Sequence, residues 1–194
     1  MSANSTRSVP PRKASTESKI AQALTTKSKS KLSGTEQFLR LELSNKTRAL
    51  LPIRQLSEVL KVPADRVAPI PHMPSWLMGV YNWRGQILWM VDLAHLVGLV
   101  PWHQQNLNVS THTVVVFNPL SSRTKTSNQQ SQMLGLVVNR VTDLESCDPH
   151  MIQPPAATST QSFTQFLRGY WMKSEDDVLA VLSGDAILGA MPKG

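Results

Sequence analysis

Apolar and polar residues alternate over several short stretches of the chain, the pattern of a β-strand with one buried face. A period of two predicts a strand over 38–43, and the turn-forming residues after it predict a return strand over 48–53. Pro52 places that second strand at an edge or an end of a sheet. Further stretches of strand length are bounded by turn signals and cover residues 80–85, 86–91, 111–117, 133–138, 141–145, 166–172 and 178–182.

Helical signals in the sequence are short. Apolar spacing predicts one helical turn within 54–60 and another over 74–79. Asp92 is placed to cap the N-terminus of a short helix over 93–97, and a similar short helix is expected over 185–188. With eight or nine strands and only one-turn helices, the pattern predicts an all-β fold. That fold is either a barrel or sandwich, or two small barrels that share a core.

The N-terminal segment differs from the rest of the chain in composition. Residues 1–35 hold seven of the 20 basic residues and one of the 13 acidic ones, so they carry +6 of the net charge of +7 and leave +1 for residues 36–194. Thirteen of them are Ser or Thr, none is aromatic, and few are aliphatic. This composition predicts a disordered basic tail over 1–35, followed by one folded domain over 36–192.

The position of the charge decides which partners it indicates. A charge of +7 spread over a domain would favour a nucleic acid or an anionic membrane, but here the domain itself is nearly neutral. No stretch approaches about eighteen consecutive apolar residues, so membrane insertion is not expected. The single cysteine, Cys147, excludes an internal disulfide and is typical of the reducing cytoplasm.

Motifs of enzymes and metal sites are not found in the sequence. There is no glycine-rich phosphate-binding motif and no nucleophile elbow, and the five histidines lack metal-ligand spacing. The acidic pair Asp176 and Asp177 falls at a predicted hairpin tip, where solvated turn residues are more common than a catalytic dyad. We therefore expect no catalytic residue, no cofactor and no metal.

One pattern of fifteen residues is specific. The segment 79–93 reads GVYNWRGQILWMVDL. It resembles the signature of CheW-like domains, which runs approximately G-[VI]-x-N-x-R-G-x-[VI]-x-x-[VI]-x-D-L. Met90 stands where Val or Ile is usual, and Trp83 replaces an aliphatic residue.

Other segments resemble the same family, and together they cover about residues 37–190. They are the upstream strand and turn at 51–60, a proline-bearing stretch at 69–74, a strand at 134–141 and the last hairpin at 167–182. Asn139 takes the place of the usual acid, and the second proline of 152–155 comes one position early. The N-terminal tail and a polar loop expected over 119–132 lie outside the resemblance.

The resemblance implies a non-catalytic adaptor. CheW-like domains have two five-stranded, SH3-like β-barrel subdomains packed together, with short helical turns. In the cytoplasm they couple the tip of a chemoreceptor to the regulatory domain of a CheA-type histidine kinase, in receptor arrays at the membrane. Another CheW-like domain is a further partner that the resemblance allows. The process expected for this chain is chemotaxis, phototaxis or twitching motility driven by type IV pili.

In this family the receptor tip docks in a groove between the subdomains, and four positions of this chain are assigned to that site. Arg84 matches the signature arginine, Glu58 matches an acid near it, and Leu56 matches the apolar residue two positions before that acid. Trp83 is expected to enlarge the apolar surface of the groove. The alternative for Glu58 and Arg84 is a structural ion pair between two turns.

Four further signature positions are expected to shape the backbone. Asn82 suits a hydrogen bond to the local backbone, and Gly85 tolerates a positive φ. Gly79 suits the end of a helical turn, and Asp92 suits the helix cap described above.

A second hypothesis belongs to a different class of protein. A β-barrel could bind nucleic acid through its basic tail, and its affinity would then depend on residues 1–35 and fall steeply with salt. Trp76 and Trp83 flank the signature and suit either an interface or the core.

Overall fold

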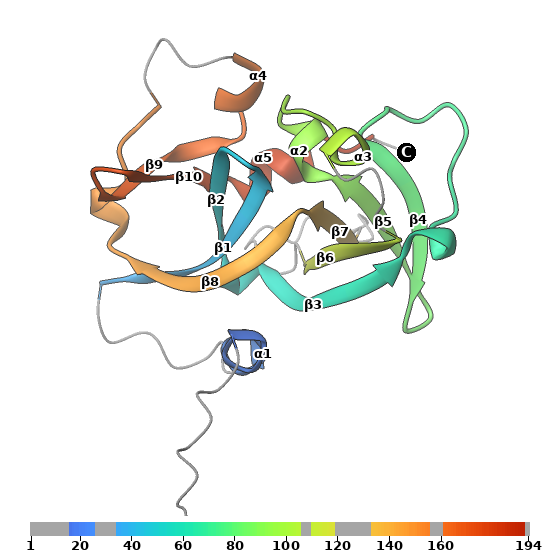
Figure 1. Ribbon diagram of the computed structural model, residues 1–194, viewed down its shortest axis with the longest axis horizontal. Helices are drawn as coiled ribbons and strands as arrows, with labels where there is room; N and C mark the ends of the chain where they lie inside the picture. Colours follow the sequence, from blue (N-terminus) through green and yellow to red (C-terminus); the bar gives the residue numbers. More distant parts are fainter. Residues whose placement is uncertain (1–15, 26–33, 106–109, 119–132, 156–160, 193–194) are drawn as a thin grey trace, which may run out of the picture.

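The computed structural model describes residues 16–25, 34–105, 110–118, 133–155 and 161–192 (Figure 1). The strands are β1 (Glu36–Ser44), β2 (Thr47–Pro52), β3 (Leu56–Pro63), β4 (Leu77–Trp83), β5 (Gln86–Asp92), β6 (Thr111–Phe117), β7 (Met133–Val138), β8 (Arg140–Cys147), β9 (Leu167–Ser174) and β10 (Asp177–Leu182). The α-helices are α1 (Thr16–Thr25), α2 (Leu93–Leu96), α3 (Trp102–Gln105), α4 (Gln161–Thr164) and α5 (Gly184–Gly189). Short 3-10 turns are η1 (Ile53–Gln55), η2 (Ala64–Arg66) and η4 (Pro149–Met151).

The ten strands of the described residues form two sheets. Sheet A has the order β8-β1-β2-β10-β9 and sheet B the order β3-β6-β7-β5-β4 (Figure 1). Each sheet contains one parallel pair, β2 with β10 and β5 with β7, among antiparallel neighbours. The chain begins in sheet A, builds all of sheet B and returns to sheet A at β8. This confirms the predicted fold class, all-β with two five-stranded, SH3-like subdomains packed together.

Both sheets contribute side chains to one buried cluster, which we call the shared core. On β6, Val115 belongs to the shared core, whereas Val114 and Val116 face a second cluster inside sheet B. On β1, Leu39 belongs to the shared core and Phe38 to a third cluster inside sheet A. Successive residues of a strand point to opposite faces, so a strand buried on both faces must be continuously apolar.

Two segments predicted as helical turns begin in a turn and continue as strands. Segment 54–60 contains the end of η1 and then β3, which pairs with β6. The register shifts between Leu56 and Glu58, and this bulge breaks the period of two, so the apolar spacing resembles that of a helix. Segment 74–79 is a tight turn, closed where Leu77 N–H donates to the Pro74 carbonyl (2.8 Å), and continues into β4.

The prediction of a disordered tail over 1–35 is wrong for residues 16–25, which form the helix α1. Ile20 and Leu24, four residues apart and therefore on one helix face, are 5% and 8% exposed and belong to the shared core. The composition excluded a core made by the segment itself, but the helix buries this pair on the domain. The rest of the predicted tail up to residue 33, and the loop expected over 119–132, lie outside the described residues.

None of the described helices is long and apolar enough to cross a membrane.

Gly79 allows the chain to approach itself closely inside sheet B. It has a φ of +142°, and a Cβ added there would collide with the carbonyl oxygen of Ala68. That carbonyl accepts a hydrogen bond from Val80 N–H at 2.8 Å, and Ala68 N–H donates to the Val80 carbonyl at the same distance. Gly79 therefore stands inside β4 rather than at the end of a helical turn.

We expect Gly79→Ala to lower the free energy of unfolding by about 3 kcal/mol or more, because both the φ value and the backbone contact exclude a side chain. Gly189→Ala is the matched control, since a Cβ there meets nothing within 4 Å, and its effect should stay within about 1 kcal/mol. Urea unfolding of both variants measures the difference. Equal stabilities would contradict this account of Gly79.

His112, on β6, is buried within sheet B. Its side chain is 3% exposed, and its ring packs edge-on against Trp102 with the centroids 4.4 Å apart. The Nδ1 atom has no hydrogen-bond partner among the described residues. Burial lowers the pKa of His112 from its ordinary value of 6.5, and the nearby Asp92 carboxylate offsets part of that shift.

Because the folded state disfavours the protonated imidazole, we expect the free energy of unfolding to fall as the pH drops below about 6.5, by at most about 1.4 kcal/mol per pH unit from this group. His112→Phe keeps a ring against Trp102 and removes the titration. The difference in stability between wild type and this variant should therefore change between pH 7.5 and about pH 5, in favour of the variant at low pH. A constant difference would contradict the assignment.

Candidate functional site: a groove between the two sheets

The β4–β5 turn presents Arg84 at the surface. Trp83 pairs with Gln86, so the connection is the two-residue loop Arg84-Gly85. Their φ values are 53° and 78°, and two positive values are characteristic of the type I′ turn that suits the twist of a hairpin. The Asn82 side chain accepts a hydrogen bond from Gly85 N–H at 3.0 Å. Asn82 and Gly85 both take part in this turn.

Arg84 lies between a carboxylate and an aromatic ring. Its Nη2 atom is 2.8 Å from Oε2 of Glu58 on β3, and its guanidinium carbon lies 4.9 Å from the centroid of the Trp83 ring. The Arg84 side chain is nevertheless 69% exposed, and that of Glu58 is 36% exposed. The structure thus brings together the two residues that the family resemblance places near each other.

The exposure of this pair limits its energetic role. Exposed ion pairs contribute about 0–1 kcal/mol to stability. The positive φ of Arg84 costs about 1–2 kcal/mol, because only glycine adopts it freely. The net contribution of Arg84 to folding is therefore small, which weighs against the alternative of a purely structural ion pair.

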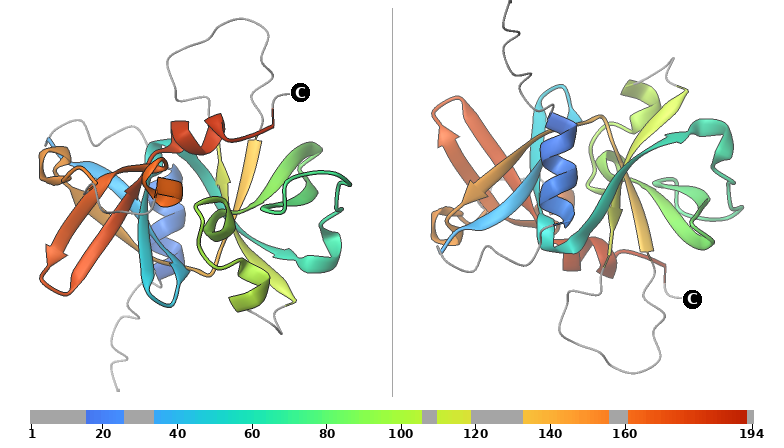
Figure 2. Two further views of the ribbon diagram at one scale, coloured as in Figure 1. Left: turned by 90° about the horizontal axis from the view of Figure 1, so that it is seen from above. Right: turned by 90° about the horizontal axis from the view of Figure 1, so that it is seen from below.

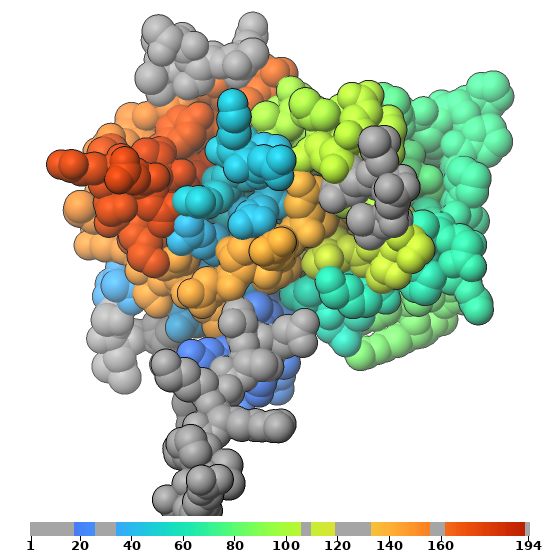
Figure 3. Space-filling view, viewed as in Figure 1, coloured from blue at the N-terminus to red at the C-terminus, as the bar shows by residue number. Residues whose placement is uncertain are grey.

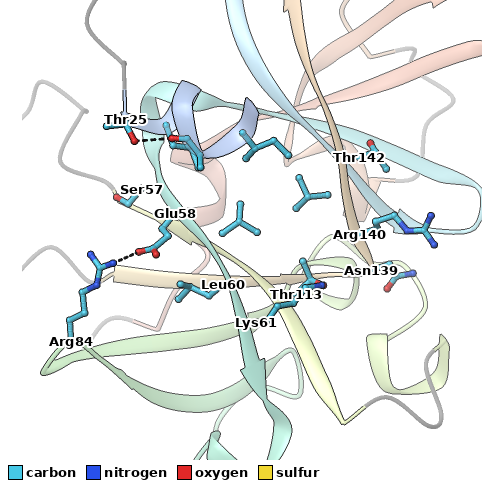
Figure 4. A pocket seen from close by; sticks show the side chains of 15 residues that line it. Thr25, Ser57, Glu58, Leu60, Lys61, Arg84, Thr113, Asn139, Arg140 and Thr142 are labelled. Carbon is cyan, nitrogen blue, oxygen red and sulfur yellow. Dashed lines mark hydrogen bonds and ion pairs between the residues drawn. The ribbon is translucent and has the colours of Figure 1, made fainter. Parts of the chain in front are cut away.

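A groove of about 1010 Å³ runs between β3 of sheet B and β8 of sheet A. Figure 4 shows Glu58 and Arg84 at one end of this groove and Asn139 and Arg140 at the other. Helix α1 forms a further wall, and in Figure 3 its atoms adjoin those of β3 and β8. The floor includes the partly buried apolar residues Val59 and Val141.

Only some of the residues predicted for the binding site line the groove. Glu58 and Arg84 line the groove. Trp83 does not line it: the side chain is partly exposed, packs on the apolar cluster of sheet B and contacts the Arg84 guanidinium. Leu56 has 0% exposure and pairs with Phe117 in the shared core. The prediction that Leu56 contributes to the binding surface is wrong in this structure, because its position after η1 turns the side chain inward.

Asp92 has the structural role predicted for it. One carboxylate oxygen accepts a hydrogen bond from His95 N–H at 3.1 Å and so caps α2, as predicted. The other accepts from the backbone N–H of Trp102 at 2.7 Å, which ties α3 to the end of β5. This second bond explains why a buried carboxylate, 3% exposed, stands at that position.

Several groove residues were not predicted from the sequence. Arg140 lies in the segment 134–141 that resembles the family, but the sequence assigns no function to it. Its side chain is 73% exposed, and its Nε atom is 3.8 Å from Oε2 of Glu42. Ile20 and Leu24 line the groove from α1, and their spacing of four residues is the signal that could have identified them.

The described residues hold no cluster of three or more His, Cys, Asp or Glu that could bind a metal.

The sequence of this chain is similar to those of several chemotaxis proteins. The chain is 28% identical over 147 residues to the chemotaxis protein CheW of Klebsiella aerogenes, a match that covers 72% of this chain and 76% of that protein. It is 29% identical over 100 residues to the probable chemotaxis protein CheW of Rhizobium etli and 27% over 101 residues to the chemotaxis protein CheW of Rhizobium meliloti. Each of these two matches covers 52% of this chain and only 56% of the relative's length.

A solved structure has a similar fold. The crystal structure of the scaffolding protein TtCheW from Thermoanaerobacter tengcongensis aligns with a TM-score of 0.59 and 21% sequence identity, over 77% of this chain and 84% of that one. The sequence profile of the CheW-like domain matches residues 37–191, which include both sheets and the β4–β5 turn. The chain therefore belongs to the family of CheW-like domains.

Proposed function

We propose that this chain is a non-catalytic adaptor that couples the cytoplasmic tip of a chemoreceptor-type, methyl-accepting protein to the regulatory domain of a CheA-type histidine kinase. The observation that carries the proposal is the exposed Glu58–Arg84 pair in the groove between the sheets. A pair that contributes little to folding is available for a partner, and an arginine offers up to five hydrogen-bond donors to it.

The groove also has the composition of a protein-binding surface. Its floor contains Val59 and Val141, and its rim carries Glu58, Arg84 and Arg140. An apolar centre with a charged rim is typical of protein–protein interfaces, in which an arginine often contributes strongly to affinity. The receptor tip is proposed to bind here, through apolar contacts in the floor and hydrogen bonds to Arg84.

The same proposal extends to the setting of the protein. It would act in the cytoplasm at membrane receptor arrays, in chemotaxis, phototaxis or twitching motility driven by type IV pili. It needs no cofactor and no metal for this role. A second CheW-like domain is a further partner in such an array.

The nucleic-acid alternative is less well supported. Its motivation was the charge of residues 1–35, but the domain itself carries only +1. Several of the domain's basic side chains are already within 4 Å of carboxylates, among them Arg40, Arg48 and Arg168. Such pairs reduce the positive surface that a phosphate backbone would need.

We expect Arg84→Glu to weaken binding of a purified receptor cytoplasmic fragment by at least about tenfold, because it removes the guanidinium and repels Glu58. Isothermal titration calorimetry measures the affinity, and thermal unfolding should show a change in stability within about 1 kcal/mol. Arg48→Glu is the matched control: Arg48 is also an exposed arginine in an ion pair, 3.0 Å from Asp177, and does not line the groove. Equal losses in both variants, or no loss in Arg84→Glu, would reject the site.

A charge swap separates binding from structure. In the double variant Arg84→Glu with Glu58→Arg the ion pair can form again with its charges reversed. If the pair served only to join β3 to the β4–β5 turn, the swap would restore binding to the wild-type level. We expect no restoration, because the partner recognises the guanidinium at position 84 itself.

A further inference from the structure

Helix α1 lies where the two sheets meet. It contacts β3, β8 and η1, and Figures 1 and 2 show it packed beside these strands of the two sheets. The helix is separated from β1 by residues 26–35 and is outside the segment that matches the family profile, which begins at residue 37. Helix α1 is therefore a wall of the groove that lies outside the part of the chain matched by the family profile.

One face of α1 fits the apolar floor of the groove. Ile20 and Leu24 are almost fully buried, and Ala23 beside them is partly buried. Ser18 and Lys19, on the other side of the helix, are exposed. An amphipathic helix that places residues i and i+4 in an apolar groove is a common mode of peptide recognition, and here the peptide belongs to the same chain.

The helix depends on the groove for its stability. Ten residues form fewer turns than an isolated helix needs to be stable in water, because nucleation costs more than so few hydrogen bonds return. The contacts of Ile20 and Leu24 supply the difference. Ten residues join α1 to β1, so α1 stays close to the groove when it undocks and can return to it.

We propose that α1 is an internal competitor of the receptor: it covers the side of the groove next to β3 and β8, and it must leave before a helix of the receptor tip can lie along the whole groove. The inference rests on the proposed function. Ile20 and Leu24 line the same groove as Glu58 and Arg84, so a receptor helix that reaches Arg84 along the groove would meet α1. Arg84 stays exposed beside α1, which leaves it available for the first contact with the receptor.

Competition of this kind lowers the apparent affinity by the fraction of molecules whose groove is open. If α1 occupies the groove in about nine of ten molecules, the receptor binds about tenfold more weakly than to an open groove. A change that undocks α1, such as phosphorylation or a partner that binds the N-terminal segment, would then increase receptor coupling without any change in the groove itself.

The test measures the affinity of the full chain for a purified receptor cytoplasmic fragment. Leu24→Asp places a charge on the buried face of α1 and should undock it, which we expect to tighten binding about five- to tenfold. Ser18→Asp is the control with the same change of charge on the exposed face of the helix, and its affinity should stay within about twofold of wild type. Equal affinities of Leu24→Asp and wild type would overturn the competition.

Hydrogen exchange on the wild-type chain tests the same point without a substitution. The amides of residues 16–25 should be protected in the free protein and should lose protection when the receptor fragment is bound. Amides that stay protected in a complex that still depends on Arg84 would overturn the inference and leave the proposed function standing. A fragment that binds neither wild type nor Leu24→Asp would instead reject the proposed function.

Discussion

Leu39 of sheet A and Val115 of sheet B belong to one buried cluster, and the remaining features of the structure depend on this contact between the sheets. Each sheet also has a cluster of its own on the opposite face, so the central strands are apolar throughout. Two five-stranded sheets that bury both faces cannot slide past each other without exposing one of them. The relative position of the subdomains is thus held by buried residues.

The groove follows from that packing. Its two walls, β3 and β8, are edge strands of different sheets, and their separation is set by the core behind them. Edge strands leave backbone groups and partly exposed side chains at the surface, and such edges are where other chains add to a protein. In this chain α1 covers part of the edge, whereas Glu58 and Arg84 stay accessible beside it. Glu58 and Arg84, the residues proposed for recognition, are therefore not among those that hold the sheets together.

The sequence predicted the strands that are regular and missed the elements that depend on distant contacts. The alternation along β1 and the apolar run of β5 are local signals, as is the cap at Asp92, and all three were read correctly. The bulge in β3 breaks the local period, so this strand looked helical. Helix α1 was not predicted, because a composition averaged over 1–35 does not reveal the spacing of Ile20 and Leu24. A motif carries no information about which way a side chain points, so the resemblance could not show that Leu56 is buried.

The strand order has a consequence for folding during synthesis on the ribosome. Sheet B is made from consecutive strands, but β1 and β2 must wait for β8, β9 and β10 to complete sheet A. At about 5–20 residues per second, the interval between β2 and β10 on the ribosome is on the order of ten seconds. During that time a lone β1–β2 hairpin, marginally stable by itself, holds buried residues such as Leu50 and Leu51 in contact with water. Sheet A is therefore the last part of the molecule to close, and the nascent chain is most exposed to chaperones and to aggregation at its own beginning.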